Sequence, residues 1–179
     1  MLRDGRVVWK SLSLRVGLTS EVGEPVRWKM CRPDVFSIRN TSVASYLEPI
    51  VHEIKVSRAD LLGDLKSKDK RDSYFEVSGQ CWYVLGCDSK GRQIGQADDV
   101  PPDCGVLIAE PERLHVARNA ANRVSLDLPS APWMALAKAV PFRFDEQLTS
   151  QKTLQGVLSE DQTEFAPAVD VEKSAGTTA

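Results

Sequence analysis

The sequence predicts an α/β fold built around a mixed β-sheet. Short runs rich in β-branched and aromatic residues recur along the first 120 residues, a pattern typical of strands. One well-marked helical segment, after Ser57, interrupts this series. The 179 residues suffice for one compact domain plus a tail. A run of strands with an inserted helix favours an α/β sandwich, in which helices flank a central mixed sheet.

The first strands are predicted from apolar alternation. We expect one within Arg6–Thr19, where apolar and polar residues alternate from Leu12 to Val16, and a second over Arg27–Arg39. The clearest strand is Glu48–Val56, because four of its nine residues are Ile or Val.

The predicted helix begins after this strand. Ser57-Arg58-Ala59-Asp60 has the spacing of a capping box, in which the Ser57 hydroxyl accepts from the backbone N–H of Asp60. We expect the helix to bury one apolar side. Its members are Leu61, Leu62 and Leu65, and the stripe continues through Tyr74, Phe75 and Val77 to Gly79.

Four further elements follow. We predict a buried strand at Cys81–Leu85, a loop over Cys87–Asp103, a hairpin and a short helix. The hairpin strands are Val106–Ala109 and Leu114–Ala117, and the helix is Pro132–Val140.

Charge is divided unevenly along the chain. The formal net charge is −2, but the segment from Asp145 onward has seven acidic residues against two lysines. That tail carries −5, so the remainder carries +3. We expect a domain over residues 1–144 and an acidic, disordered tail over 145–179. A mildly basic domain is compatible with a polyanionic ligand without requiring one.

The four cysteines form no Cys-x-x-Cys pair, so we expect reduced thiols. The sequence has no signal-peptide pattern, and no apolar run approaches the ~18 residues of a membrane span. We therefore expect a cytoplasmic protein with no membrane partner.

Glu53 and Lys55 carry the chemistry that the sequence suggests. Two residues apart on a strand, they leave the same face, and we expect Ile54 and Val56 to point into the core. Asp34 begins the preceding strand, so antiparallel pairing of the two strands would bring it to Glu53.

Two carboxylates and the backbone carbonyl of Ile54 would form a hard oxygen site suited to Mg²⁺ or Mn²⁺. Beside such an ion, Lys55 could orient or deprotonate a water, or offset the charge on a phosphate. The alternative is a Glu–Lys surface pair on an edge strand.

The arrangement of these residues resembles a known superfamily. Arg32-Pro33-Asp34 followed by Glu53-Ile54-Lys55 is similar to the motif of the PD-(D/E)XK nucleases, which have the restriction-endonuclease-like fold. The run His52–Asp64 resembles the MmcB-like DNA-repair family within it, as do Lys70, Tyr74 and the strand Trp82–Leu85. This resemblance covers about Cys31 to Val116. It departs from the family at Gly79-Gln80, where an Asp is often found, and at Arg71, where a Trp usually stands.

Further residues could contact the metal or nucleic acid. The resemblance makes Glu21 an additional candidate acidic ligand, with a surface-loop acid as the alternative. Arg58, Lys66, Lys70 and Tyr74 are candidates for nucleic-acid binding. Because aspartates interleave with these lysines, a solvated helix face remains the alternative, and Asp60 is expected to serve mainly as a cap.

The resemblance implies a Mg²⁺- or Mn²⁺-dependent endonuclease that hydrolyses DNA phosphodiesters in repair or in the processing of foreign DNA. One alternative is a non-cleaving module of the same fold that binds DNA or a repair partner protein. Another is a scaffold in which Glu53 and Lys55 form a structural ion pair. The sequence does not indicate an oligomeric state.

Overall fold

The computed structural model describes residues 5–18, 26–123 and 128–143. The main sheet has six strands: β1 (Arg6–Lys10), β4 (Val35–Arg39), β5 (Ile50–Lys55), β6 (Gln80–Leu85), β7 (Gly105–Ala109) and β8 (Leu114–Arg118), in the order β1-β4-β5-β6-β7-β8. A separate hairpin consists of β2 (Leu14–Leu18) and β3 (Arg27–Cys31). The described helices are α1 (Arg58–Leu65), α2 (Lys68–Phe75) and α3 (Ser130–Lys138), and two short 3₁₀ turns cover Ala44–Tyr46 and Ala97–Asp99.

The sheet is mixed. β5, β6 and β7 run parallel, whereas β1, β4 and β5 are antiparallel neighbours, as are β7 and β8. The connection from β5 to parallel β6 passes through α1 and α2. The prediction of an α/β fold around a central mixed sheet is therefore confirmed, as are the strand at β5 and the hairpin of β7 and β8.

Two strand predictions were wrong in extent. Residues 27–39 form two strands, because β3 pairs with β2 while β4 pairs with β1 and β5. Pro33 lies at the break and has no N–H to donate to a ladder. The predicted first strand likewise divides into β1 and β2, and Ser11, between them, has a φ of 49°.

The helical region also differs from the prediction. α1 and α2 are separate helices, and Ser57 precedes α1 without a side-chain capping hydrogen bond, so the capping box is absent. Leu61 is fully buried, but Leu62 is 42% exposed and faces away from the core. Helices this short bury only a narrow stripe, and Leu62 lies one position outside it.

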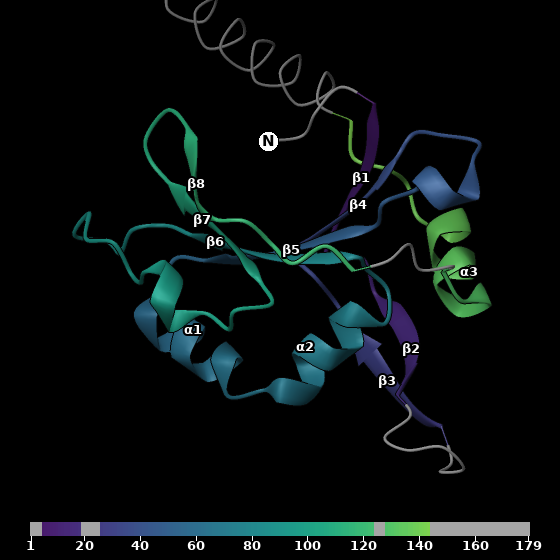
Figure 1. Ribbon diagram of the computed structural model, residues 1–179, viewed down its shortest axis with the longest axis horizontal. Coiled ribbons are helices and arrows are strands. Elements are labelled where there is room, and N and C mark those ends of the chain that lie inside the picture. The colour runs from purple at the N-terminus through teal and green to yellow at the C-terminus, as the bar shows by residue number, and fades with distance from the viewer. Residues whose placement is uncertain (1–4, 19–25, 124–127, 144–179) are drawn as a thin grey trace, which may run out of the picture. The chain divides into compact units, whose positions relative to one another are not determined.

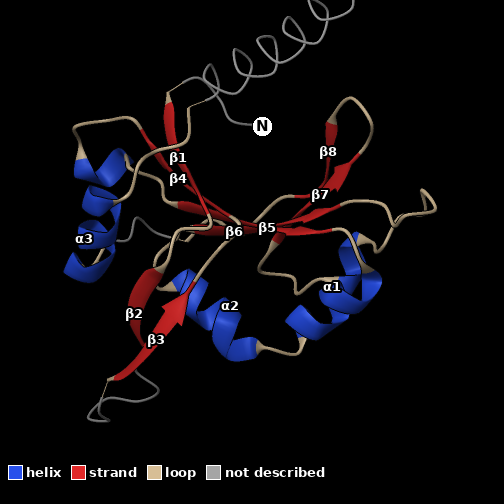
Figure 2. Ribbon diagram, turned by 180° about the vertical axis from the view of Figure 1, so that it is seen from behind, coloured by secondary structure: helices blue, strands red, loops and turns tan. Residues whose placement is uncertain are grey.

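α1 and α2 lie on the same side of the sheet, as two opposite views show (Figure 1, Figure 2). The sheet side chains that face them include Phe36, Val51, Tyr83 and Val106, all fully buried. Glu53 alternates with Val51 on β5 and is therefore inside this layer.

The predicted orientation of β5 was wrong in this respect. Glu53 and Lys55 do share a face, but that face is the interior, and Ile54 and Val56 are 45% and 63% exposed. No helix in residues 5–18, 26–123 or 128–143 is long and apolar enough to cross a membrane. The predicted tail, residues 145–179, lies outside the described residues.

Candidate active site

The candidate site is a buried cluster of charged side chains at the carboxyl end of β5. The side chains of Glu53 and Lys55 are 2% and 5% exposed. An unpaired charge at such depth would cost several kcal/mol, so its partners decide what the cluster can do.

Glu53 accepts hydrogen bonds from three side chains. Its Oε1 accepts from the Tyr74 hydroxyl at 2.5 Å, and its Oε2 accepts from Lys55 Nζ at 3.0 Å and Lys70 Nζ at 2.8 Å. Tyr74 and Lys70 are both on α2, so packing of this helix over β5 completes the surroundings of the carboxylate. The Tyr74 ring is fully buried.

Asp64, on α1, is the second buried carboxylate, and the sequence prediction did not include it. Its side chain is 5% exposed and accepts from Tyr83 Oη at 2.8 Å and from Lys70 Nζ. Lys55 Nζ lies 3.6 Å from the same carboxylate. Asp64 is three residues after Leu61, so helical spacing from the buried leucine was the signal that could have identified it.

The two carboxylates and the two ammonium groups at the centre of the cluster balance in charge. Two carboxylates, Glu53 and Asp64, face the two ammonium groups of Lys55 and Lys70, and the exposed Asp60 adds a carboxylate 3.6 Å from Lys55 Nζ. Burial alone would lower the pKa of Lys55, but the hydrogen bond and charge of Glu53 raise it above its usual value. Lys55 is therefore held as a cation.

Burial has the opposite effect on Asp64. It would raise the pKa of this carboxyl, but hydrogen bonds from Lys70 and Tyr83 outweigh it and lower the pKa below its usual value. Burial also raises the pKa of Tyr74 and of Tyr83, and their acidic partners raise both further. Both phenols therefore remain hydrogen-bond donors.

Asp34 precedes the neighbouring strand β4 and contacts the backbone of β5. β4 and β5 are antiparallel with Val35 opposite His52, so Asp34 lies at the strand end beside Glu53. Its Oδ2 accepts from the backbone N–H of Ile54 at 2.7 Å. The predicted antiparallel pairing of the two strands is thus confirmed. The contact of Asp34 with β5 is made by the backbone N–H of Ile54.

The carboxylates suit Mg²⁺ in chemical type. In the described arrangement, however, the ammonium group of Lys70 bridges Glu53 and Asp64, the position that a shared cation would take. The described residues contain no group of three His, Cys, Asp or Glu side chains placed to hold a metal. Among the three donors to Glu53, Lys70 is the most exposed, at 30%. A divalent ion at Glu53 would have to displace Lys70, and the hydrogen bonds of Glu53 to Lys55 and Tyr74 would have to rearrange.

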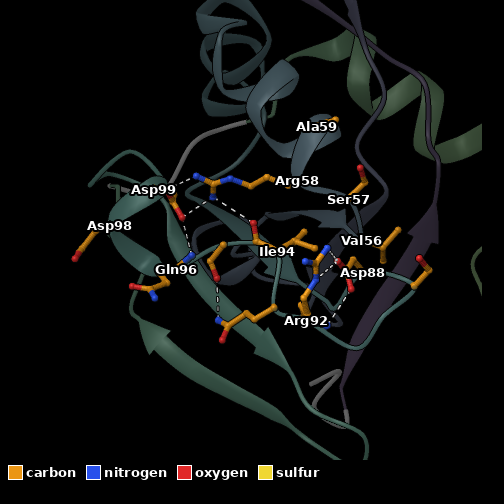
Figure 3. A pocket seen from close by; sticks show the side chains of 13 residues that line it. Val56, Ser57, Arg58, Ala59, Asp88, Arg92, Ile94, Gln96, Asp98 and Asp99 are labelled. Carbon is orange, nitrogen blue, oxygen red and sulfur yellow. Dashed lines mark hydrogen bonds and ion pairs between the residues drawn. The ribbon is translucent and has the colours of Figure 1, made fainter.

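A hollow of about 990 Å³ lies beside the end of β5, between the Val56–Ala59 segment and the loop carrying Asp88 to Asp99. Figure 3 shows the Arg58 side chain directed at Asp99, which it contacts through two nitrogens at 2.7 and 2.9 Å. The Arg58 side chain is 47% exposed, so a phosphate could reach it only in competition with Asp99.

The other predicted contact residues are dispersed. Lys66 is exposed at the end of α1, as expected for a solvent-facing lysine. Lys70 and Tyr74 point inward to Glu53. Tyr74 is fully buried and therefore offers no surface to nucleic acid. Glu21 lies outside the described residues.

Comparisons with known proteins leave the family open. No family model matches the chain, and no curated protein matches it. A solved structure of a protein of unknown function from Silicibacter pomeroyi is similar to this chain with a TM-score of 0.46 and 20% sequence identity, over 90% of this chain and 84% of that protein.

Proposed function

We propose that the protein is a divalent-metal-dependent endonuclease that hydrolyses phosphodiester bonds in DNA, in repair or in the processing of foreign DNA within the cytoplasm. The observation that supports this most is the meeting of Asp34 with β5 at Ile54, immediately between Glu53 and Lys55. Asp34 therefore lies at the same end of the sheet as Glu53 and Lys55, which supports the proposal.

The proposal gives each residue a role. Asp34 and Glu53 would hold the metal, which when bound polarises the phosphodiester and lowers the pKa of a bound water. Lys55, held as a cation by its acidic neighbours, would offset negative charge that grows on the phosphate. Tyr74 would fix the orientation of the Glu53 carboxylate through its hydroxyl.

The second candidate is a non-cleaving module that binds DNA or a partner protein. It is favoured by the complete pairing of Glu53, which accepts from Tyr74, Lys55 and Lys70. In that case the charged cluster would serve to hold α1 and α2 on the sheet.

Strand scission distinguishes the two candidates. We expect purified protein to nick plasmid or branched DNA with Mg²⁺ or Mn²⁺, and Asp34→Asn and Lys55→Met to abolish nicking while the fold is retained. The matched controls are Asp103→Asn and Lys138→Met, which change exposed side chains and should nick normally. Equal nicking by all four variants would assign the activity to a contaminant, and DNA binding without nicking would favour the second candidate.

A further inference from the structure

The sheet carries an apolar row of side chains on the face opposite α1 and α2, which we call the open face. The strand registers align Ile54, Val84, Leu107 and Val116 across β5, β6, β7 and β8. Ile54 and Val116, at the two ends of the row, are 45% and 48% exposed, and Leu114 is 38% exposed. Parallel strands are normally covered on both faces, so we expect another surface to pack on this row.

A hollow of about 1280 Å³ lies over the open face. Trp82 lines it and packs closely over Gly105 of β7, where an added Cβ atom would be 2.3 Å from the indole ring. The turn of the β7–β8 hairpin forms one wall of the hollow. This turn is closed by a hydrogen bond from the N–H of Glu110 to the carbonyl of Arg113 at 2.9 Å, and both views show it directed away from α1 and α2 (Figure 1, Figure 2). The open face is therefore hollowed beside a projecting hairpin.

The opposite wall of the hollow, which we call the β1–β4 wall, is positively charged. Its charged residues are Arg6, Arg39 and Glu48. Glu48 Oε2 accepts a hydrogen bond from Arg39 at 2.7 Å, and Arg6 Nη1 lies 3.8 Å from the same oxygen. Two guanidinium groups thus share one carboxylate, which leaves this wall a net charge of +1. The Arg39 side chain is 51% exposed and that of Arg6 is 11% exposed, so Arg39 is the cation that a partner can reach.

The hairpin wall is negatively charged. It carries Glu110, Glu112 and Arg113, two acids against one cation, so its net charge is −1. Arg113 Nε donates to Glu110 at 2.6 Å, whereas no described residue forms an ion pair with Glu112, which is exposed. Glu112 is therefore the acid available to a partner, in the turn of an element that projects from the sheet.

We propose that the open faces of two copies of the chain pack together in a two-fold symmetric dimer. A two-fold axis turns each hairpin wall toward the β1–β4 wall of the other copy, so walls of opposite charge meet at both ends of the contact. Glu112 of each copy pairs with Arg39 of the other. Between these two contacts the exposed parts of Leu114 and Val116 become buried, and this apolar burial supplies the stability that exposed ion pairs alone do not.

The lining of the hollow argues against a nucleic acid as the occupant. Its charged residues are the three arginines and three glutamates of the two walls, so their charges cancel. His52 adds no charge at neutral pH, because burial and the charge of Arg6 lower its pKa to about 4. A polyanion requires a positive excess, whereas a second copy requires only two walls of opposite sign. Glu53 and Lys55 point to the other face of β5, so the dimer is independent of the proposed cleavage.

The test is sedimentation velocity of the full chain over a range of concentrations, where we expect a dimer that dissociates on dilution. Val116→Glu places a carboxylate in the apolar row and should weaken the dimer at least about tenfold, because that carboxylate would be buried in the contact. The matched control is His115→Glu. His115 is exposed and pairs with Ile108, so it points to the opposite face from Val116, and this variant should dimerise as the wild type does.

Reversal of charge tests the pairing of Glu112 with Arg39. Glu112→Arg and Arg39→Glu each bring like charges together at both contacts of a homodimer, so each should raise the dissociation constant at least about fivefold. In an equimolar mixture, the heterodimer of the two variants has opposite charges at both contacts. We expect this heterodimer to form about as tightly as the wild-type dimer.

A wild type that stays monomeric at every concentration would overturn the proposal and assign the open face to a different partner. So would a dimer unaffected by Val116→Glu, equal losses in Val116→Glu and His115→Glu, or a mixture that dimerises no better than either charge variant alone. Circular dichroism of each variant checks that a loss of dimer does not come from unfolding.

Discussion

The hydroxyl of Tyr74 offers a direct measure of how strongly the buried cluster is held together. Tyr74→Phe removes one oxygen, which donates to Glu53 Oε1 at 2.5 Å, and leaves the ring that packs beside it. A hydrogen bond to a charged group contributes about 1.5–3 kcal/mol, and the carboxylate that loses it stays buried. We therefore expect the free energy of unfolding to fall by about 1.5–3 kcal/mol.

The assay is urea unfolding followed by circular dichroism at constant pH. The chain provides matched comparisons, because Tyr83→Phe removes the corresponding bond to Asp64 and Tyr46→Phe alters a tyrosine that is 59% exposed. We expect Tyr83→Phe to resemble Tyr74→Phe and Tyr46→Phe to lie within about 0.5 kcal/mol of the wild type. If Tyr74→Phe also stays within that range, Glu53 does not depend on this donor and the description of the cluster is incorrect.

Two more variants test the helix that covers the cluster and the lysine that bridges it. Leu61→Ala should cost about 2–5 kcal/mol in unfolding free energy and Leu62→Ala less than about 1 kcal/mol, because only Leu61 is buried; equal costs in urea titrations would contradict the orientation of α1. Lys70→Ala removes the ammonium group between Glu53 and Asp64, so it should lower the melting temperature measured in EDTA. Added Mg²⁺ should then raise the melting temperature of Lys70→Ala by more than it raises that of the wild type. An identical Mg²⁺ response in both proteins would show that no cation competes with Lys70.

The sequence predicted the chain-local features of the fold. β5, the β7–β8 hairpin and α3 all have patterns that depend on neighbouring residues alone, namely apolar runs and turn residues. The division of residues 27–39 into two strands depended on pairing with distant partners, β2 on one side and β1 on the other. Pro33 marked the break, but local pattern could not show that the chain changes sheets there.

The sequence predicted Asp34, Glu53 and Lys55 as candidate site residues, but it did not predict that Glu53 and Lys55 are buried beneath α1 and α2. Alternation places Glu53 and Lys55 on one face, but it does not tell which face is buried. A carboxylate and an ammonium group were expected outside because unpaired charges are costly in the core. Here α1 supplies Asp64 and α2 supplies Lys70. Because these distant residues pair with Lys55 and Glu53, the charged face of β5 lies in the interior.

The proposed nuclease and the non-cleaving module differ in what they require of the buried charged cluster. The proposed metal-dependent cleavage would require Lys70 to withdraw from Glu53, whereas a structural role would require only the ion pairs already present. Lys70 is the most exposed of the three donors to Glu53, and its withdrawal would break its ion pairs with both Glu53 and Asp64.

Metal binding by the purified protein is the most direct test of the central claim, because cleavage can come from a contaminant and bound metal cannot. Titration with Mn²⁺, followed by electron paramagnetic resonance of the free ion, should show one site in the wild type. That site should be lost in Asp34→Asn and in Glu53→Gln but retained in Asp103→Asn, whose side chain is 63% exposed. Mn²⁺ binding that survives both Asp34→Asn and Glu53→Gln, or no binding in the wild type, would contradict the assignment of these two carboxylates as the metal site.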